Sequence, residues 1–317
     1  MPKAERNYFK QMCPKYHFFK SLLMLYLFLI NLFSNRSTMR YLPYYLVLFA
    51  LLLAAPMHAQ QGNWGVGAAA QGGGGTVVML SDANAVINNP SSMVQSNRRI
   101  GIGLSIENRF SNADFIQYAL AGNYQLNTTS AVGIGIQVQG GSLYNQKNVF
   151  FSYGRSIASK ISIGLAAVAT QYAAANYGSA FTINAKIGAH WQPLPQLRLA
   201  STLSNPFTYT LGDDYKTTSE LTLGAAYQPS TKIVINTEVA ASNNQIADLR
   251  FGIHYQPKSI FVVRMGYSSA AASYTFGCGI TKKGMNIDLF AKTHPLLKLT
   301  SGVSLAYQIP STKSQKQ

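Results

Sequence analysis

The sequence predicts an all-β fold, a transmembrane antiparallel β-barrel of about 14 strands that is preceded by an N-terminal hatch. Three observations lead to this prediction. From residue 99 onward, apolar residues alternate with small or polar ones, and a period of two residues indicates strands rather than helices. The apolar face of this alternation carries no charge in mid-strand. The connections between the alternating segments are short and long in turn.

Two apolar runs precede the alternating region. The first, residues 22–33, is 12 residues long, well short of the roughly 20 that a membrane-spanning helix needs. The second begins after Met39 and ends in the letters MHA, and a basic start, an apolar core and a small final residue are typical of a secretory signal peptide. We therefore expect a signal peptide at 39–59, cleaved after Ala59. Residues 1–38 are then an upstream extension ahead of the true start codon, with a genuine long leader as the alternative.

Charge supports a membrane location. Residues 1–59 hold seven of the 26 Lys/Arg and one of the 10 Asp/Glu, so the remaining chain has a net charge of +10. Its charged residues are about 11 per cent of the total, against roughly 25 per cent in soluble domains. The basic residues are spread singly, without the clusters that nucleic-acid binders show. Anionic lipid headgroups and lipopolysaccharide are therefore the expected neighbours, nucleic acid is not, and the barrel is expected to be a monomer.

The alternating segments define the expected barrel, residues 98–309. Its fourteen strands are predicted near 99–110, 115–126, 130–140, 147–156, 160–170, 179–191, 196–204, 218–227, 231–241, 246–256, 259–268, 273–281, 285–293 and 298–309. Charged residues fall opposite the apolar face, except Lys147 and Arg155 near the ends of one strand. Lipid requires this arrangement, because Arg or Lys at the bilayer midplane costs ~2–4 kcal/mol.

The connections fix the expected orientation. Alternate ones are short, and three of them contain Gln-Pro, whereas the others include the 13-residue segment 205–217. In outer-membrane barrels the short turns lie on the periplasmic side. An even number of strands returns the chain to that side, where a polar tail, 310–317, follows.

The segment before the first strand is the expected hatch, residues 60–97. Fourteen strands enclose a lumen that their own side chains do not fill, especially where inward residues are Gly and Ala. Within this segment, the stretch SDANAVINNPSSM contains the four predicted hatch residues: Asp82, Asn88, Asn89 and Pro90. We expect the amide side chains to bond to lumen Arg, Glu and main-chain groups, and the proline to exclude the residue before it from helical geometry.

The same stretch resembles the segment that precedes the barrel in the FadL family of outer-membrane proteins, including its PorV-like branch. Asn89-Pro90 matches the family's Asn-Pro, and Ser91 stands where the family has Ala. Later segments, such as LTLGAAYQP and FGIHYQP, resemble the C-terminal part of that group, so the resemblance covers roughly residues 62–309. It implies passive transport of a small hydrophobic molecule, through the lumen or a lateral gap. The alternative that it implies is an accessory role with secretion-system proteins in type IX-like secretion or surface attachment.

Catalytic and metal chemistry is not expected. His190, His254 and His294 fall on separate elements, Cys278 has no partner after the leader is removed, and we expect neither an enzyme nor a cofactor. One further group of charges is predicted to point inward as a lumen charge ladder: Glu238, Arg250, Arg264 and Asp288. A structural role in stiffening the lumen and anchoring the hatch is favoured for it over a substrate site.

Overall fold

The computed structural model describes residues 65–96, 98–207, 209–211, 215–242, 245–270 and 272–310, all within one compact unit, 58–317. The expected upstream extension, the signal peptide, the start of the hatch and the polar tail after Pro310 lie outside these residues.

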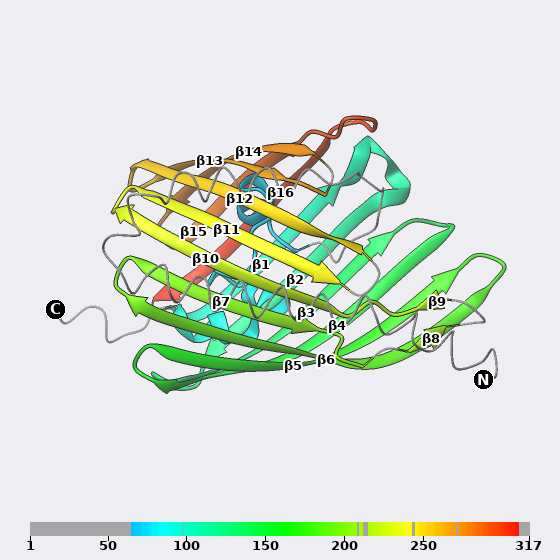
Figure 1. The fold of residues 1–317 in the computed structure, drawn as a ribbon, viewed down its shortest axis with the longest axis horizontal. Helices are drawn as coiled ribbons and strands as arrows, with labels where there is room; N and C mark the ends of the chain where they lie inside the picture. Colours follow the sequence, from blue (N-terminus) through cyan, green and yellow to red (C-terminus); the bar gives the residue numbers. More distant parts are fainter. Residues whose placement is uncertain are drawn as a thin grey trace, which may run out of the picture. The chain divides into compact units, whose positions relative to one another are not determined.

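Fourteen strands close into an antiparallel barrel in which β1 pairs with β16 and every other strand pairs with its neighbours along the chain (Figure 1). The predicted strand number and order are therefore confirmed. The strands are β1 (Arg98–Asn108), β2 (Ile116–Gln125), β3 (Ser130–Gly140), β4 (Tyr144–Ala158), β5 (Ile161–Ala174), β6 (Gly178–Leu194), β7 (Leu197–Ser204), β10 (Glu220–Ser230), β11 (Ile233–Ser242), β12 (Gln245–Lys258), β13 (Phe261–Ser268), β14 (Ser273–Lys282), β15 (Met285–Lys292) and β16 (Thr300–Pro310).

Strands β4, β5 and β6 are longer than predicted. At the long-loop end β4 begins three residues earlier and β5 ends four residues later than predicted, beside a small ribbon of β8 (Thr210–Leu211) and β9 (Tyr215–Lys216) (Figure 1). β6 gains one residue at this end and three at the short-turn end. The apolar alternation fades at the long-loop end, because this part of the hairpins is polar or small on both faces, although main-chain pairing continues to Ala174 and Gly178. Asn205 N donates to Ala185 O at 3.0 Å, so the loop after β7 covers the edge of β6 that β7 leaves free.

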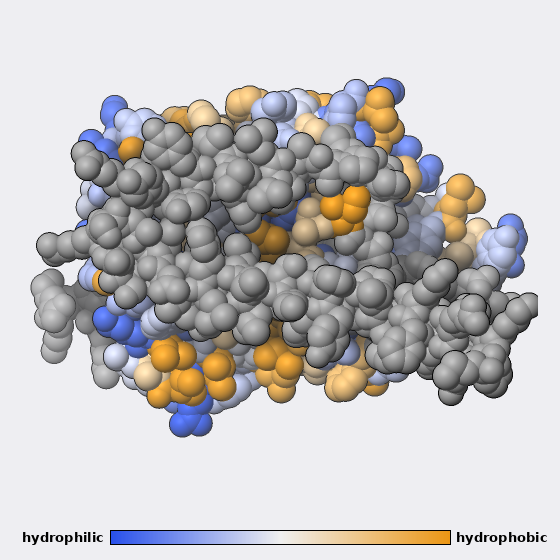
Figure 2. Space-filling view, in the orientation of Figure 1, coloured by the Kyte–Doolittle hydropathy of each residue, from blue (hydrophilic) through white to orange (hydrophobic). Residues whose placement is uncertain are grey.

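The outer surface of the barrel is apolar between its two ends. Large apolar side chains point outward at alternate positions, such as Ile163 (47% exposed) and Leu165 (54%) on β5, whereas Ser162 and Ala166 between and beside them are buried. Figure 2 shows apolar residues on the flank of the barrel and hydrophilic ones toward its two ends. This is the surface that a bilayer requires of a closed barrel.

A repeated pair, an aromatic residue followed by glutamine, lies within three residues of the short-turn end of five strands. The pairs are Tyr124-Gln125, Trp191-Gln192, Tyr227-Gln228, Tyr255-Gln256 and Tyr307-Gln308. Each aromatic side chain is 38–50% exposed on the outside. In four of the pairs the glutamine N–H donates to a carbonyl of the adjoining turn at 2.8–2.9 Å. The pair thus lies next to the short turns and places an aromatic girdle where membrane and water meet.

The wall is continuous through the middle of the described strands. Register shifts occur only within a few residues of strand ends, for example between Trp191 and Leu194 or between Ala240 and Ser242. Every neighbouring pair is otherwise in unbroken register. The lumen is therefore closed laterally at mid-height in this part of the chain.

The segment before β1 lies inside the barrel and contains three short helices, α3 (Ala68–Gly72), α4 (Ala85–Asn88) and the 3-10 helix η2 (Pro90–Gln95) (Figure 1). Two further 3-10 turns, η3 (Arg109–Ser111) and η4 (Ala113–Phe115), form the first long loop. Among the residues described, no helix has the length and apolar character needed to cross a membrane. The hatch packs on β2–β6 at one side and on β13–β16 at the other.

The lipid-facing surface gives a first prediction. Leu165→Arg places a charge near mid-membrane on β5 and should lower the free energy of unfolding by about 2–4 kcal/mol. Ile157→Arg, at an outward position next to the short turn after β4, should cost only about 0–1 kcal/mol, because the side chain reaches water there. Urea unfolding of both variants in lipid vesicles measures the difference. Equal losses would contradict the assignment of the lipid-facing midplane.

Candidate functional site

Asn88 joins the start of the described hatch to the end of α4. Its Oδ1 accepts a hydrogen bond from Val66 N at 2.9 Å, and its Nδ2 donates to Val66 O at 2.8 Å. The amide thus satisfies both main-chain groups of one residue, as a neighbouring strand would. Asn88 is buried, so this pair ties the start of the described hatch to the end of α4 away from water.

Asn89 and Pro90 organise the second half of the hatch. Asn89 is extended (φ −150°, ψ 103°), as expected before proline, and its Oδ1 caps η2 by accepting from Ser91 N at 3.1 Å. Its Nδ2 donates to Val78 O at 2.9 Å, and Ser92 Oγ donates to the same oxygen at 3.0 Å. Both asparagines bond to groups of the hatch itself, not to the lumen Arg and Glu side chains that we expected to contact them.

The wall instead binds the main chain of the hatch. Lys186 Nζ donates to Ile87 O at 2.6 Å and Ser152 Oγ to Val86 O at 2.7 Å, so two wall residues satisfy carbonyls of α4. Val78 N donates to Glu238 Oε1 at 2.6 Å. Further bonds of this kind are Ser162 Oγ to Ser91 O (3.0 Å), Ala68 N to Ser304 Oγ (2.7 Å), Gly74 N to Thr275 Oγ1 (2.9 Å) and Arg250 Nη1 to Gly75 O (3.3 Å).

Glycines in the wall give the hatch room to approach. A Cβ atom at Gly164 would collide with the main chain of Pro90 and Ser91, and one at Gly188 with the Asn89 amide. The same holds around much of the barrel: the wall glycines whose added Cβ would meet the hatch are Gly103, Gly133, Gly135, Gly154, Gly164, Gly188, Gly224, Gly252, Gly266 and Gly277. We call these ten glycines the glycine seat of the hatch. The sequence analysis noted inward glycines but did not predict the seat. Its sign in the sequence is a glycine at an inward position on one strand after another.

Asp82 is the acidic residue of the hatch. Its Oδ1 accepts from Asn84 N at 3.0 Å, which starts the turn into α4. Burial raises the pKa of the Asp82 carboxyl to about 6, and the carboxylate of Asp288 adds to this rise, whereas the Asn84 bonds and the Arg264 guanidinium oppose it. The hatch therefore contains a carboxyl group that changes charge near neutral pH.

The predicted charge ladder consists of two separate groups in the described lumen. Glu238 and Arg250 are opposite each other in register on β11 and β12, with Arg250 Nη1 3.9 Å from Glu238 Oε2. Arg250 also binds Asp248 at 2.7 Å, a partner that we did not predict. Arg264 Nη1 instead binds Asp288 Oδ1 at 2.6 Å, across the intervening strand β14.

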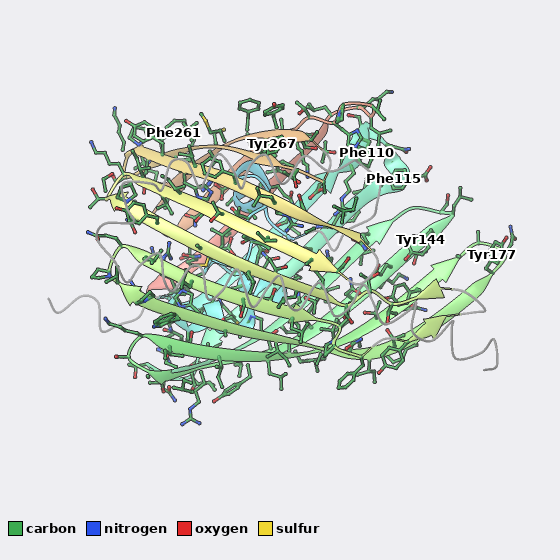
Figure 3. The ribbon with its side chains drawn as sticks, viewed as in Figure 1. Phe110, Phe115, Tyr144, Tyr177, Phe261 and Tyr267 are labelled. Atoms are coloured by element: carbon green, nitrogen blue, oxygen red, sulfur yellow. The ribbon has the colours of Figure 1, made fainter. Side chains whose placement is uncertain are left out.

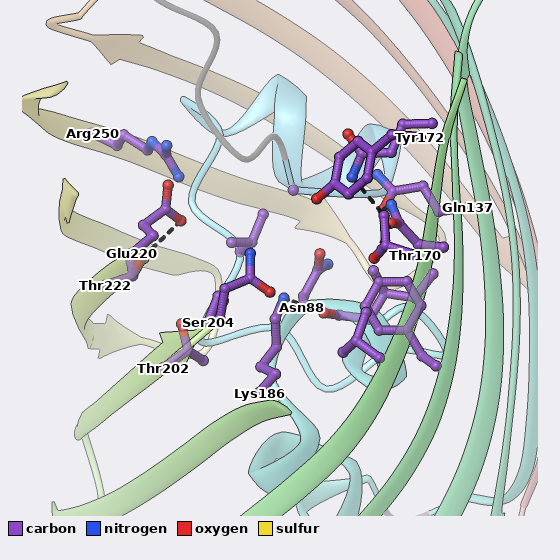
Figure 4. A pocket seen from close by; sticks show the side chains of 18 residues that line it. Asn88, Gln137, Thr170, Tyr172, Lys186, Thr202, Ser204, Glu220, Thr222 and Arg250 are labelled. Atoms are coloured by element: carbon purple, nitrogen blue, oxygen red, sulfur yellow. Dashed lines mark hydrogen bonds between the residues drawn. The ribbon is translucent and has the colours of Figure 1, made fainter. Parts of the chain in front are cut away.

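A small cavity lies above the hatch, on the long-loop side (Figure 4). Hatch residues Val77, Ile87 and Asn88 form part of its lining. The barrel side is mostly polar, with an apolar portion at Phe150 and Val168; the polar residues include Gln137, Gln146, Asn148, Thr170, Lys186, Thr202, Ser204, Glu220, Thr222 and Arg250. Its volume is about 50 Å³, enough for a few water molecules but far below the roughly 300 Å³ of small ligand pockets. This cavity is therefore too small to hold a drug-sized ligand in the described structure.

Aromatic residues mark the long-loop rim (Figure 3). Phe110 and Phe115 are edge-to-face at 6.2 Å, and Phe110 contacts the ring of His294 at 5.5 Å. His294 Nδ1 accepts from Leu296 N and Leu297 N at 3.2 and 3.0 Å, so it is committed to shaping its loop. Among the described residues there is no group of three His, Cys, Asp or Glu side chains that could hold a metal ion.

The chain matches no protein-family profile and no curated protein sequence. Solved structures nonetheless share its fold. The CymD monoaromatic hydrocarbon channel matches with a TM-score of 0.64 at 13% identity, over 79% of this chain and 100% of that one. The toluene transporter TbuX of Ralstonia pickettii matches with a TM-score of 0.62 at 14% identity, over 78% of this chain and 98% of that one. The toluene transporter TodX of Pseudomonas putida matches with a TM-score of 0.61 at 11% identity, over 80% of this chain and 99% of that one. At these identities the likeness establishes the fold.

The hatch contacts predict that Asn88→Ala combined with Asn89→Ala loosens the hatch and leaves the barrel folded. Each lost bond costs about 1 kcal/mol, or ~1–3 kcal/mol where a buried main-chain group loses its partner. The wall keeps its own strand pairs, so heat-modifiable migration on gels should be unchanged while single-channel conductance rises. Asn127→Ala, which removes a similar bond in an exposed turn, serves as control. Unchanged conductance in a folded double mutant would show that these bonds do not hold a gate.

Asp82 predicts a pH dependence. Its pKa is raised in the seated hatch, so the seated state binds an additional proton between about pH 4 and pH 6. The contribution of Asp82 to the stability of the seated hatch is therefore complete at about pH 4 and is lost as the pH rises through about 6. Conductance should increase from pH 5 to pH 7, and Asp82→Asn should flatten this increase. Asp114→Asn, at an exposed position, is the control; equal pH profiles for Asp82→Asn and the unmodified protein would refute the assignment.

Proposed function

We propose that this protein is a passive channel, gated by its hatch, through which small hydrophobic molecules cross an outer membrane. The observation that carries the proposal is a hatch that occupies the lumen and, apart from the chain that continues into β1, is attached to the wall in the described residues by non-covalent bonds. Such an element blocks the pore at rest and can move without breaking the barrel. The shared fold supports it, because the similar structures are named as a hydrocarbon channel and toluene transporters.

The continuous wall favours a route along the barrel axis. No gap opens at mid-height among the described strand pairs, so a molecule entering from the long-loop side meets the cavity above the hatch first. There, Phe150, Val168 and Ile87 offer it apolar contact, while the polar lining holds water that it must displace. Passage then requires the hatch to shift away from its glycine seat.

We also propose how the barrel is oriented in the membrane. Short turns face the periplasm and long loops face outward, with lipid and lipopolysaccharide around the apolar belt. The barrel acts as a monomer without metal, cofactor or catalytic step. Asp82, Asn88, Asn89 and Pro90 serve as hatch residues that set how firmly the gate is closed.

A second candidate function is an accessory role toward secretion-system proteins. One feature favours it: the loop after β7 forms the β8–β9 ribbon and exposes Phe207 (61%) and Tyr209 (38%) at the long-loop end. Exposed aromatic residues are common in protein contacts. This role would not require the hatch to move.

A cross-link tests the gate directly. A Cβ atom on Gly103 of β1 would lie 3.1 Å from Cβ of Ala83 in the hatch, so a shift of a few tenths of an ångström gives disulfide geometry. In a Cys278→Ser background, Ala83→Cys with Gly103→Cys should lose uptake of radiolabelled toluene when oxidised and regain it on reduction. Ala83→Ser with Gly103→Ser is the matched control. Equal uptake in the oxidised and reduced states would refute gating by the hatch, and uptake no higher than in cells lacking the protein would refute the transport role.

A further inference from the structure

The short-turn end of the barrel carries charge of one sign. Nine basic residues lie in its turns or at the adjoining strand ends. One of them, Arg198 of β7, shares the inward face with buried Ala200 and Thr202; the other eight are Arg98, Arg99, Arg155, Lys160, Lys232, Lys258, Lys282 and Lys283. The acidic residues of the described chain lie in the hatch, in the lumen or toward the long loops: Asp82, Glu107, Asp114, Glu220, Glu238, Asp248 and Asp288. We name these eight basic residues the basic rim.

The basic rim is not neutralised by the described protein. All five of its lysines are exposed, and the four ion pairs of the described residues involve other side chains. Lys160 Nζ donates to Pro193 O at 3.2 Å, a neutral acceptor. Like charges on one rim repel each other, so anions from outside the chain would be attracted to it.

The charges are distributed around the circumference. The lysines occupy the β4–β5, β10–β11, β12–β13 and β14–β15 connections, and the arginines Arg98 and Arg99 begin β1. A docked protein would cover one sector of the barrel and favour a patch. A lipid leaflet surrounds the barrel on all sides and favours a ring.

The basic rim also lies at the correct depth for headgroups. Lys160 O accepts from Gln192 N, next to Trp191, and Lys232 O accepts from Gln256 N, next to Tyr255. Each lysine thus sits directly beyond the aromatic girdle, which marks the membrane–water interface. Its flexible ammonium group can extend from there into the layer of lipid phosphates.

We propose that the basic rim binds anionic phospholipids, with the phosphate groups of a phosphatidylglycerol-type leaflet neutralising the lysines around the short-turn end. The site is a lipid-binding ring, separate from the hatch and independent of conduction. It would hold a shell of anionic lipid around this end and fix the depth of the barrel in the membrane.

Trp191 provides the measurement. In a Trp64→Phe background it is the remaining tryptophan of the chain, and it lies beside Lys160. In bilayers of phosphatidylcholine, brominated phosphatidylglycerol should quench Trp191 fluorescence at lower mole fraction than brominated phosphatidylcholine does. A preference of about fivefold is expected for one nearby lysine. Raising the salt concentration should reduce this preference.

Two variants and a control complete the test. Lys160→Gln should bring the preference at Trp191 toward one, and replacing all five rim lysines with Gln should abolish it. Lys147→Gln, on the same hairpin but at the long-loop end, should leave it unchanged. Equal quenching by the two lipids in the unmodified protein, or a preference that survives the five-lysine variant, would overturn the proposal. Binding of soluble polyglutamate in neutral bilayers without any lipid preference would also overturn it and indicate an acidic protein partner instead.

Discussion

The width of a closed fourteen-stranded sheet governs the rest of this structure. The wall satisfies its own main-chain hydrogen bonds and presents apolar side chains to lipid, but its circumference encloses more space than inward side chains can fill. The inward positions are, in addition, often small, as at Ala119, Ala121 and Ala166. The space left in this way is what admits a folded segment of main chain, and the hatch occupies it.

Side chains bind the main chain of the hatch from two sources, the hatch itself and the wall. Inside the hatch, Asn88 and Asn89 replace the hydrogen bonds that regular secondary structure would supply to Val66 and Val78. Toward the wall, Ser, Thr, Lys and Glu side chains of the strands bind hatch carbonyls and N–H groups. Each such bond adds only about 1 kcal/mol net, so firm closure results from their number rather than from any one of them.

The barrel could be predicted from the sequence and the hatch geometry could not. Period-two alternation and short turns determine strands locally, so all fourteen strands could be predicted. The extra length of β4 and β5 at the long-loop end could not, because the alternation stops where lipid no longer imposes it. The alternation of inward and outward positions on neighbouring strands also predicted that Glu238 and Arg250 lie close together. Arg264 and Asp288 meet across β14 because Gly279 between them has no side chain to keep them apart, which requires knowledge of three strands together. The helices of the hatch are too short to leave a periodic signal.

The position of the hatch in the chain has a consequence for the order of assembly. The hatch directly precedes β1, and β1–β16 is the pairing that joins the two ends of the sheet; Ala68 and Ser304, which are bonded, lie 236 residues apart. Its seat is built from strands of both halves, so the seat is complete only when the ring is nearly closed. Contacts of such long sequence separation form late in folding. We therefore expect the hatch to enter the lumen together with the strand that closes the sheet, so that the finished barrel already contains it.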